Sequence, residues 1–402
     1  MIIGLIREEK LPPDRRVALL PDQCAEVLKR YPEVQLVVQP SPHRCVPETE
    51  YLAAGCTVSE DISPCGVLLG IKEVPVLSLL PDKTYFFFSH TIKKQKHNRR
   101  LLQAILEKNI TLVDYECLTD EAGQRIIAFG RYAGIVGTYN AFWTYGKKYG
   151  LYNLKRAYEC RDRAEMEAEY AKIQLPPVKI ILTGTGRVGK GALEVLQGIG
   201  IRQVNPTELL GQSLGEPVFA VLRSQDYHRH RDGRVWDSAD FHQNPQDYVS
   251  HFTGFTQAAD ILIATAYWHP AAPVLFTTAD MQWDSFRIRV VADITCDIDG
   301  SIPCTVKSSS IPDPVYDYNR FTGEVLPAFT GPENVSVMAI DNLPCELPLD
   351  ASRYFGEQLI NNVLPHLIHP GQSPGNLLPR ATIVAQGQLT KRYSYLSDFV
   401  AP

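Results

Sequence analysis

The residues with the clearest chemical meaning surround three glycines near the middle of the chain. The stretch Ile180-Ile-Leu-Thr-Gly184-Thr-Gly186-Arg-Val-Gly189 is an apolar run followed by Gly-x-Gly-x-x-Gly. Between a strand and a helix, Gly184 permits a tight turn, Gly186 lets the backbone approach a pyrophosphate, and Gly189 lets the helix pack closely. The helix N-terminus also favours an anion. The motif therefore predicts a dinucleotide site, the alternative being a turn that merely packs. Its expected contacts are Gly184, Thr185, Gly186, Arg187, Val188 and Gly189.

A second set of polar residues follows the expected strands of the first third of the chain. They are Arg16, Lys72, Glu73, His90 and Glu116. Because ligands of open α/β sheets bind outside the carboxyl ends of the strands, we expect these side chains to share one rim. Lys and His suit proton transfer near neutral pH, carboxylates beside them set their pKa values, and Arg offers a fork to a carboxylate.

Each of these residues also has a purely structural alternative. Arg16 could be a surface charge, Lys72-Glu73 an ordinary loop, His90 a helix cap and Glu116 a salt-bridge partner. The shared position at strand ends favours a functional set over these separate explanations.

Two further charged stretches could contribute to a site. Asp293 ends the apolar run Val290-Val-Ala-Asp293, with Asp297 and Asp299 close behind. The Glu of an EF-hand is missing, so a cofactor or substrate role is favoured for Asp293 over a Ca²⁺ loop. We expect His228-Arg-His-Arg-Asp232 to form a solvated turn whose charge could help to hold a phosphate.

Strands and helices must alternate to position these residues. The apolar patterns predict strands at 2–6, 35–39, 67–71, 84–88, 111–115, 180–183, 218–222, 261–264, 289–294 and 338–343. Helices are predicted at 22–30, 51–55, 98–108, 131–149, 156–172, after the glycines, and from 351 to about 368. This alternation predicts the α/β class, with two Rossmann-like, doubly wound parallel-sheet domains.

Composition excludes several classes of protein. A chain of 402 residues is too long for one ordinary core, and a net charge of −5 with interspersed signs argues against nucleic-acid binding. Nine scattered cysteines without Cys-x-x-Cys indicate neither a disulfide framework nor a zinc site. The N-terminus is not a signal peptide, and no apolar run is long enough to span a membrane. We expect a soluble, cytoplasmic protein with no metal, nucleic-acid or membrane partner.

Eight motifs make the chain similar to a known superfamily. They are Arg15-Arg-Val-Ala-Leu-Leu-Pro21, Gly70-Ile-Lys-Glu-Val-Pro75, Tyr85-Phe-Phe-Phe-Ser-His-Thr-Ile-Lys93, Leu112-Val-Asp-Tyr-Glu-Cys117, Ala128-Phe-Gly-Arg-Tyr-Ala-Gly134, Leu182-Thr-Gly-Thr-Gly-Arg-Val-Gly-Lys-Gly-Ala192, Val291-Ala-Asp-Ile-Thr295 and Ala339-Ile-Asp-Asn-Leu-Pro344. On these residues the chain resembles the alanine dehydrogenase and lysine-forming saccharopine dehydrogenase superfamily. The likeness is greatest to the lysine–ketoglutarate reductase branch.

The resemblance implies an architecture and an activity. A substrate domain would comprise residues 1–140 and 340–402, a dinucleotide-binding domain residues 141–339, and the cofactor would lie in the cleft between them. The reaction would be the reversible NAD(P)-dependent condensation of lysine with 2-oxoglutarate to saccharopine.

The resemblance also implies roles for the rim residues. Lys72 and His90 match the family's catalytic pair, and Arg16 its substrate-binding arginine. Glu73 and Glu116 match the carboxylates that tune the pair, and Arg131 joins this substrate-binding or tuning group.

Two departures leave questions about the cofactor and the end of the chain. The residues after the glycine helix, Ile201-Arg-Gln-Val-Asn205, offer no acid for the ribose of NAD, and Glu208 comes late. This absence favours NADP, or at least tolerates it, so the expected cofactor is NADP or NAD. The tail from about Gly371 has no familiar counterpart and suggests an oligomer contact. An alanine dehydrogenase-like enzyme and a non-catalytic, cofactor-binding regulatory protein are the alternatives.

Overall fold

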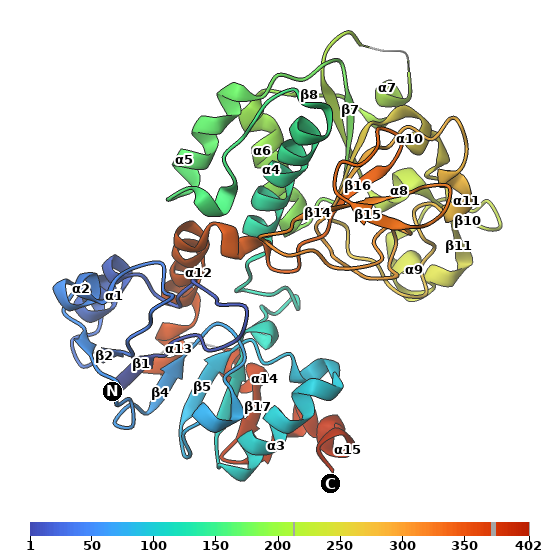
Figure 1. The fold of residues 1–402 in the computed structure, drawn as a ribbon. Coiled ribbons are helices and arrows are strands. Elements are labelled where there is room, and N and C mark those ends of the chain that lie inside the picture. The colour runs from blue at the N-terminus through green and yellow to red at the C-terminus, as the bar shows by residue number, and fades with distance from the viewer. Residues whose placement is uncertain (212–213, 371–374, 402) are drawn as a thin grey trace. The chain divides into compact units, whose positions relative to one another are not determined.

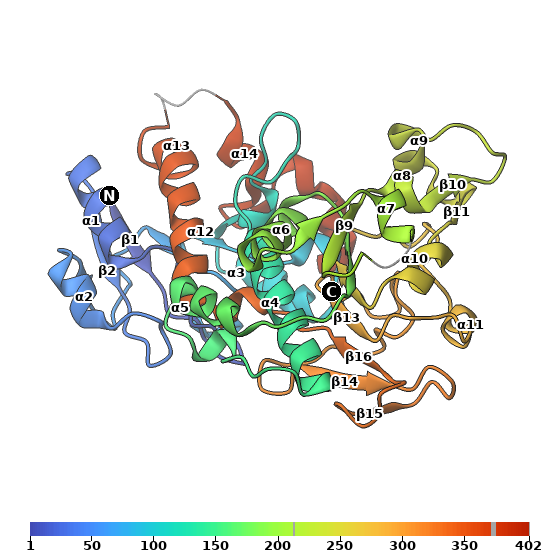
Figure 2. The ribbon, with the colours of Figure 1, turned by 90° about the horizontal axis from the view of Figure 1, so that it is seen from above.

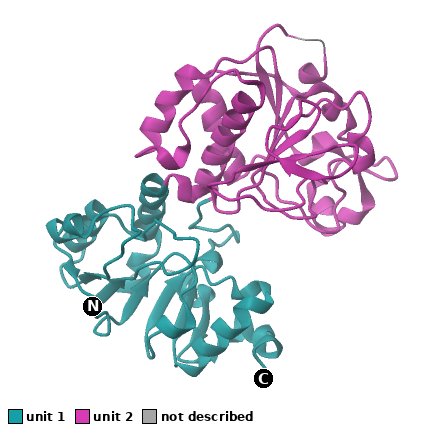
Figure 3. Cartoon of the chain, viewed as in Figure 1, with its two compact units in different colours: residues 1–129, 348–402 teal, residues 130–347 magenta. Residues whose placement is uncertain are grey.

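The protein consists of two compact units, each built around its own eight-stranded sheet. The computed structural model describes residues 1–211, 214–370 and 375–401. The first unit comprises residues 1–129 and 348–402, and the second residues 130–347 (Figure 3). The prediction of an α/β fold with two such domains is confirmed. The division falls after Phe129 and Leu347 rather than at the expected 140/141 and 339/340, because α4 (Gly130–Tyr149) packs along its whole length within the second unit.

The sheet of the first unit has the order β18-β17-β6-β5-β4-β1-β2-β3. Its strands are β1 (Ile2–Leu5), β2 (Gln35–Val38), β3 (Thr57–Val58), β4 (Val67–Leu69), β5 (Thr84–Phe87), β6 (Thr111–Asp114), β17 (Thr382–Ala385) and β18 (Gln388–Leu389). The strands from β6 to β3 pair in parallel, whereas β17 and β18 are antiparallel additions at one edge.

Helices cover both faces of this first sheet. Buried Val27 of α1 and Phe355 of α12 pack with Leu36 on one face, whereas Leu102 and Ile105 of α3 pack on the other. The helices are α1 (Pro21–Arg30), α2 (Glu48–Ala53), α3 (Arg99–Glu107), α12 (Pro348–Asn362), α13 (Leu364–Ile368), α14 (Leu377–Ala381) and α15 (Ser397–Val400), with short 3₁₀ segments η1 (Val76–Ser78), η2 (Thr91–Lys93), η3 (Lys96–Asn98), η4 (Tyr115–Cys117) and η9 (Lys391–Leu396).

The end of the chain belongs to the core of the first unit. Strand β17 pairs with β6, and Ile383, Val384 and Leu396 are buried in one cluster with residues of α3. Figure 1 shows β17 next to α14 in the first unit. The tail, for which the sequence suggested only an oligomer contact, therefore completes a hydrophobic core. This pairing joins residues more than 250 positions apart, so no local pattern predicted it.

The sheet of the second unit has the order β15-β14-β16-β13-β12-β7-β9-β8. Its strands are β7 (Lys179–Thr183), β8 (Arg202–Gln203), β9 (Val218–Leu222), β12 (Ile261–Ala264), β13 (Val290–Asp293), β14 (Val315–Tyr318), β15 (Val325–Pro327) and β16 (Val335–Met338). The strands from β16 to β8 pair in parallel. A separate antiparallel ribbon joins β10 (His228–His230) and β11 (Tyr248–Ser250).

The glycine helix of the second unit packs against the long helix that precedes it. Helices α4 and α6 (Arg187–Ile199) lie side by side in both ribbon views (Figures 1 and 2). The other helical segments are η5 (Ala157–Glu159), α5 (Arg163–Ala168), η6 (Glu169–Lys172), α7 (Pro206–Leu210), α8 (Ser224–Tyr227), α9 (Ser238–Gln243), η7 (Pro245–Asp247), α10 (Thr253–Ala258), α11 (Thr278–Met281) and η8 (Leu343–Glu346).

Two predicted elements of this unit are wrong. The single helix expected at 156–172 is broken, because the Asp162 side chain caps the N-terminus of α5 by accepting the Glu165 N–H. Instead of the strand expected at 338–343, β16 ends at Met338, and the 3₁₀ segment η8 begins at Leu343. Neither change moves the residues of the candidate site.

Candidate active site and dinucleotide cavity

The rim residues of the first unit follow four adjacent parallel strands. The order β6-β5-β4-β1 brings the carboxyl ends of these strands together. Arg16 follows β1, Lys72 and Glu73 follow β4, His90 follows β5, and Glu116 follows β6. The expected common edge therefore exists, and the individual contacts define how these groups interact.

Glu73 and His90 form a hydrogen-bonded pair. Glu73 Oε1 lies 2.6 Å from His90 Nδ1, and Glu73 Oε2 accepts from Lys10 Nζ at 2.7 Å. Burial favours the neutral acid, but the hydrogen bonds from His90 and Lys10 outweigh it and lower the pKa of Glu73 to about 2. An ionised Glu73 orients the imidazole by accepting Nδ1–H, which leaves Nε2 as the nitrogen available for proton transfer. His90 has a left-handed backbone, with φ of 53°, and its ring stacks on Phe88.

Arg16 is buried and engaged by a carboxylate that the sequence did not single out. Its Nε and Nη2 donate to Asp14 Oδ1 and Oδ2 at 3.0 and 2.6 Å, and its guanidinium lies 4.1 Å from the centre of the Phe129 ring. The Arg16 backbone N–H also donates to Asp14. This pairing fixes the orientation of the guanidinium, which is only 3% exposed. The Asp-x-Arg spacing was the signal that sequence reasoning missed.

Glu8 is a second residue that the sequence did not identify. Its Oε1 accepts the Ile71 N–H at 2.6 Å, and its Oε2 accepts the Lys72 N–H at 2.8 Å. Burial and the nearby Asp14 raise the pKa of Glu8 to about 7, against the effect of these two N–H donors and of Arg16. Glu8 thus binds the backbone that carries Lys72.

Glu116 pairs with cations rather than with His90. It is 6% exposed, contacts Arg125 through Oε1, and lies 3.4 Å from Lys93 Nζ. Buried Asp114 connects it to the neighbouring loop, because Asp114 accepts the N–H groups of Glu116 and Ser89 at 2.7 and 2.9 Å. Glu116, which was predicted to tune the catalytic pair, therefore forms no direct hydrogen bond with His90.

Arg131 belongs to the second unit, whereas the other residues of its predicted group belong to the first. It is on α4, and its Nε and Nη2 donate to the two carboxylate oxygens of Glu194 on α6 at 2.7 and 2.9 Å. Arg163 also binds Glu194, at 2.8 Å. These contacts link α4, α5 and α6 within the second unit, and the predicted role of Arg131 in substrate binding or tuning stays a prediction.

The glycine turn has the geometry that its sequence predicts. Gly184 follows β7 with φ of +92°, a conformation that side-chain-bearing residues rarely adopt. A Cβ at Gly189 would lie 2.3 Å from the Gly184 carbonyl oxygen, so this glycine permits the close helix packing. Among the described residues, apart from Gly186 itself and its two chain neighbours, nothing lies within 4 Å of a Cβ built at Gly186, the N-cap of α6. The space beside Gly186 suits the approach of a pyrophosphate.

A cavity of about 440 Å³ opens at this turn. The five predicted contacts from Gly184 to Val188 line it, together with Ser224, His228, Thr265 and Tyr267. It lies at the carboxyl ends of β7, β9 and β12, the expected edge for a dinucleotide.

Asp293 is not among the residues that line this cavity. It is buried at the end of β13, where Oδ1 accepts the Thr295 N–H at 3.1 Å and the Thr295 hydroxyl at 2.6 Å. Burial raises its pKa. These contacts form a local turn, whereas a cofactor contact was expected from the sequence.

The residue beside the ribose position differs from the one inferred from the sequence. Chain order suggested the residues directly after α6, but β8 lies at the sheet edge and β9 lies between β8 and β7. The residue after β9 is Arg223, which is exposed, followed by Ser224 in the cavity lining. Asp226 is directed back to the Arg223 backbone N–H, at 2.6 Å.

The expectation of a solvated turn at 228–232 is wrong for its histidines. His228 and His230 are buried in β10. The ring centres of His228 and Phe241 are 4.7 Å apart, and those of His230 and Tyr248 are 5.1 Å apart. Burial lowers the pKa of His228 to about 4, so the ring is neutral near pH 7. His228 supplies part of the cavity wall rather than a positive charge.

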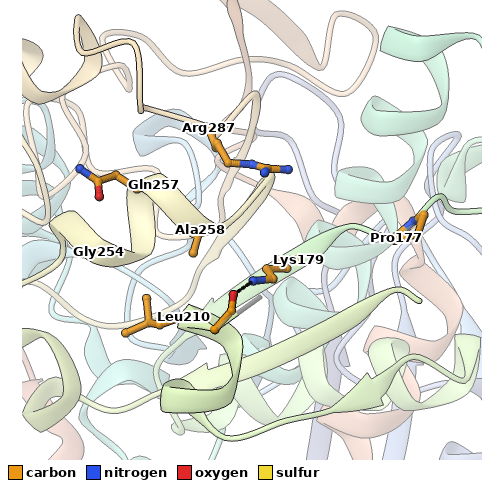
Figure 4. Close-up of a pocket in the computed structure, with 8 residues that line it drawn as sticks. Pro177, Lys179, Leu210, Gly254, Gln257, Ala258 and Arg287 are labelled. Carbon is orange, nitrogen blue, oxygen red and sulfur yellow. Dashed lines mark hydrogen bonds between the residues drawn. The ribbon is translucent and has the colours of Figure 1, made fainter. Parts of the chain in front are cut away.

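A second cavity of about 420 Å³ lies at the opposite edge of the same sheet. Lys179, at the start of β7, and Arg287, which precedes β13, line it (Figure 4). Lys179 Nζ donates to the carbonyls of Leu209 and Gly211, and Arg287 pairs with Asp260 at 2.8 Å. The amino ends of the strands are the wrong edge for a dinucleotide.

Neither a metal cluster nor a membrane span was found among the described residues. In residues 1–211, 214–370 and 375–401, no group of three His, Cys, Asp or Glu could hold a metal ion. In the same ranges, no helix has the length and apolar character needed to cross a membrane.

Comparisons with known proteins agree with this geometry. Residues 4–136 match the family model of the alanine dehydrogenase/PNT N-terminal domain. Alpha-aminoadipic semialdehyde synthase of Arabidopsis thaliana is 30% identical, in an alignment that covers 98% of this chain and 41% of that protein. The predicted superfamily resemblance is confirmed. The chain spans less than half the length of this relative.

Two other proteins match over most of their lengths. Saccharopine dehydrogenase [NAD(+), L-lysine-forming] of Emericella nidulans is 25% identical over 89% of this chain and 90% of that protein. The structure of an L-alanine dehydrogenase superposes with a TM-score of 0.65 at 17% identity, over the full length of both chains, and so confirms the fold. Both of these proteins are named as dehydrogenases.

Proposed function

We propose that the protein is an NAD(P)-dependent oxidoreductase of the saccharopine dehydrogenase type. It would condense lysine with 2-oxoglutarate and reduce the resulting imine to saccharopine, reversibly. The single observation that carries this proposal is the Glu73–His90 hydrogen bond of 2.6 Å next to Lys72 at the strand ends. The similarity to saccharopine dehydrogenase over 90% of that protein supports the same reaction.

His90 is the proposed general acid and base. The ionised Glu73 holds Nδ1–H, so Nε2 accepts a proton when the amine adds to the ketone and returns it when water leaves. The carboxylate also stabilises the imidazolium that forms, as a positioned Asp does in hydrolase triads. Lys72 is the proposed partner in proton transfer to the product nitrogen.

Arg16 is the proposed anchor for a substrate carboxylate. Asp14 fixes its guanidinium, and the Phe129 ring supports its face. Saccharopine and both of its precursors carry carboxylates, and a guanidinium with five donors can serve Asp14 and a ligand together. Pairing of the substrate carboxylate with the Arg16 guanidinium would neutralise the carboxylate charge and so favour the bound substrate over the substrate in water.

The second unit fits the cofactor. The turn at Gly184, the open space at Gly186 and the cavity that Thr185 and Val188 line suit a pyrophosphate and its nucleosides. When bound, NAD(P)H supplies the hydride that reduces the imine carbon.

The first experiment is an initial-rate assay of NADPH and NADH oxidation with lysine plus 2-oxoglutarate. We expect turnover with this pair and none with pyruvate plus ammonia or glyoxylate plus ammonia. Turnover only with pyruvate would move the protein to the alanine dehydrogenase type. Cofactor binding without turnover in every mixture would contradict the proposed reaction and favour a regulatory protein.

We further propose that the cofactor is NADP. Strand β9, which pairs with β7, is followed by Arg223 and Ser224. An NAD-specific site carries an acid for the ribose 2′-hydroxyl at this position. A guanidinium there matches a 2′-phosphate in charge and geometry. Asp226, the nearest acid along the chain, is engaged by the Arg223 backbone.

Replacing Arg223 by Ala is expected to weaken binding of 2′,5′-ADP by about 10–100-fold, with little effect on 5′-AMP, because charged hydrogen bonds to the 2′-phosphate are lost. Isothermal titration calorimetry measures both affinities without turnover. Arg234→Ala, at another exposed arginine of the second unit that does not line the cavity, is the control and should change neither. Equal weakening of both nucleotides by Arg223→Ala would contradict the assignment.

A further inference from the structure

We propose that Glu8 is a positioning residue that holds the backbone of Ile71-Lys72-Glu73 and thereby orients both proposed proton-transfer groups. The inference rests on the proposed function, because it gives Glu8 a role in proton transfer by Lys72 and His90. Nothing in the sequence pattern assigned Glu8 a role. Its importance follows from the contacts of one side chain with a segment more than sixty residues away.

The Glu8 carboxylate forms a two-point contact with consecutive amides. Oε1 accepts the Ile71 N–H at 2.6 Å and Oε2 accepts the Lys72 N–H at 2.8 Å. Since an ionised carboxylate is acceptor-only, both oxygens are matched to donors that follow the end of β4. The contact restricts the peptide planes on the N-terminal side of Lys72, and so the direction in which its side chain leaves the backbone.

The next residue extends this effect to the histidine. Glu73 directly follows Lys72, and its carboxylate holds His90 Nδ1 at 2.6 Å. A shift of the 71–73 backbone would therefore move the Lys72 side chain and the orienting group of His90 together. A misplacement on the order of 1 Å is enough to cost about 100-fold in rate.

The fold brings the loop after β1 close to this segment. A Cβ at Gly70 would lie 2.8 Å from Ile6 Cδ1 and 3.5 Å from Glu8 Oε1, so the side chains of Ile6 and Glu8 approach the backbone at the end of β4. On the other side, Asp14 and Arg16 act electrostatically on Glu8, and Glu8 acts on buried Tyr115. Glu8 therefore lies among the rim groups.

The contact itself is tested by hydrogen exchange in Glu8→Gln, which keeps the size of the side chain but replaces one acceptor by a donor. We expect the amides of Ile71 and Lys72 to exchange about tenfold faster than in the wild type. Glu9→Gln is the matched control, because Glu9 is exposed and forms an ion pair with Arg7, at 3.3 Å. Unchanged exchange in a folded Glu8→Gln protein would overturn the proposal, whether or not the assigned substrates are correct.

Steady-state kinetics test the consequence. Glu8→Gln is expected to lower kcat about 10–100-fold while KM for NADPH changes less than about twofold, and Glu9→Gln should leave both unchanged. In a Lys72→Met background, Glu8→Gln should cost much less, since both changes act on the same group. Additive losses would show that Glu8 does not act through Lys72. Faster amide exchange combined with no turnover in the wild type would reject the reaction but retain the contact.

The pH dependence gives a readout that a merely structural role would not move. With the pKa of Glu8 raised to about 7 from 4.5, its charge is lost as pH falls below 7, so wild-type kcat should fall over that range. The folded protein binds this proton more tightly than the unfolded chain, so the Glu8 contribution to stability decreases as pH rises from about 4.5 to 7. Both trends should be absent in Glu8→Gln. Their persistence would assign them to other groups and overturn this part of the inference.

Discussion

Replacing His90 by Asn is expected to lower kcat for saccharopine formation by about 10²–10⁴-fold, and Lys72→Met should have an effect of similar size. General acid–base groups contribute rate factors of this order. Asn retains a polar group beside Glu73 but cannot exchange a proton near neutral pH, and Met retains the length of Lys72 without its charge. Stopped-flow measurement of NADPH oxidation at saturating substrates separates this loss in kcat from changes in binding.

The nucleotide affinity of these variants should stay unchanged, because the cavity proposed for the cofactor is lined by residues of the second unit. His43→Asn and Lys29→Met, exposed positions of the first unit, serve as controls. A kcat within about threefold of wild type for both His90→Asn and Lys72→Met would exclude these residues from the chemistry. Parallel loss of nucleotide binding would instead indicate misfolding.

Replacing Gly134 by Ala is expected to destabilise the second unit by about 1–3 kcal/mol, or more if the helices cannot separate. A Cβ at Gly134 on α4 would lie 2.0 Å from the Val188 carbonyl oxygen and 2.7 Å from the Ala192 nitrogen on α6. These contacts are with backbone, so relief requires the two helices to move apart. Because α6 begins at the glycine turn, the movement should also weaken nucleotide binding.

Thermal unfolding followed by circular dichroism, with calorimetric titration of 2′,5′-ADP, measures both effects of Gly134→Ala. Gly254→Ala is the matched control in helix α10, where the new Cβ would meet only the Leu210 side chain, at 3.5 Å. There the higher helix propensity of Ala should leave stability unchanged or raise it by about 1 kcal/mol. Equal stability of Gly134→Ala and wild type would contradict the tight packing of α4 on α6.

Elements that depend on local sequence patterns could be predicted well. The apolar runs that became β1, β5, β9 and β12 are buried strands because their side chains pack on both faces of a sheet. Elements interrupted by capping residues were less accurate. Asp162 interrupts the single helix predicted at 156–172, because its side chain accepts a backbone N–H at the start of α5. Hydrophobic periodicity does not reveal such a contact.

The sequence by itself determined the glycine turn, the alternation of strands and helices, and the positions of Lys72, Glu73 and His90 after strands. These features follow from backbone conformation and side-chain spacing over a few residues. Only the tertiary structure decided that Glu73 binds His90 and that Asp14 binds Arg16. It decided as well that Glu8 binds the Lys72 backbone and that Arg131 pairs with Glu194. It also decided that β9, and hence Arg223, lies beside β7. Strand order and side-chain pairing arise from contacts between distant segments, which compete with many alternatives of similar local propensity and are selected only when the whole core packs.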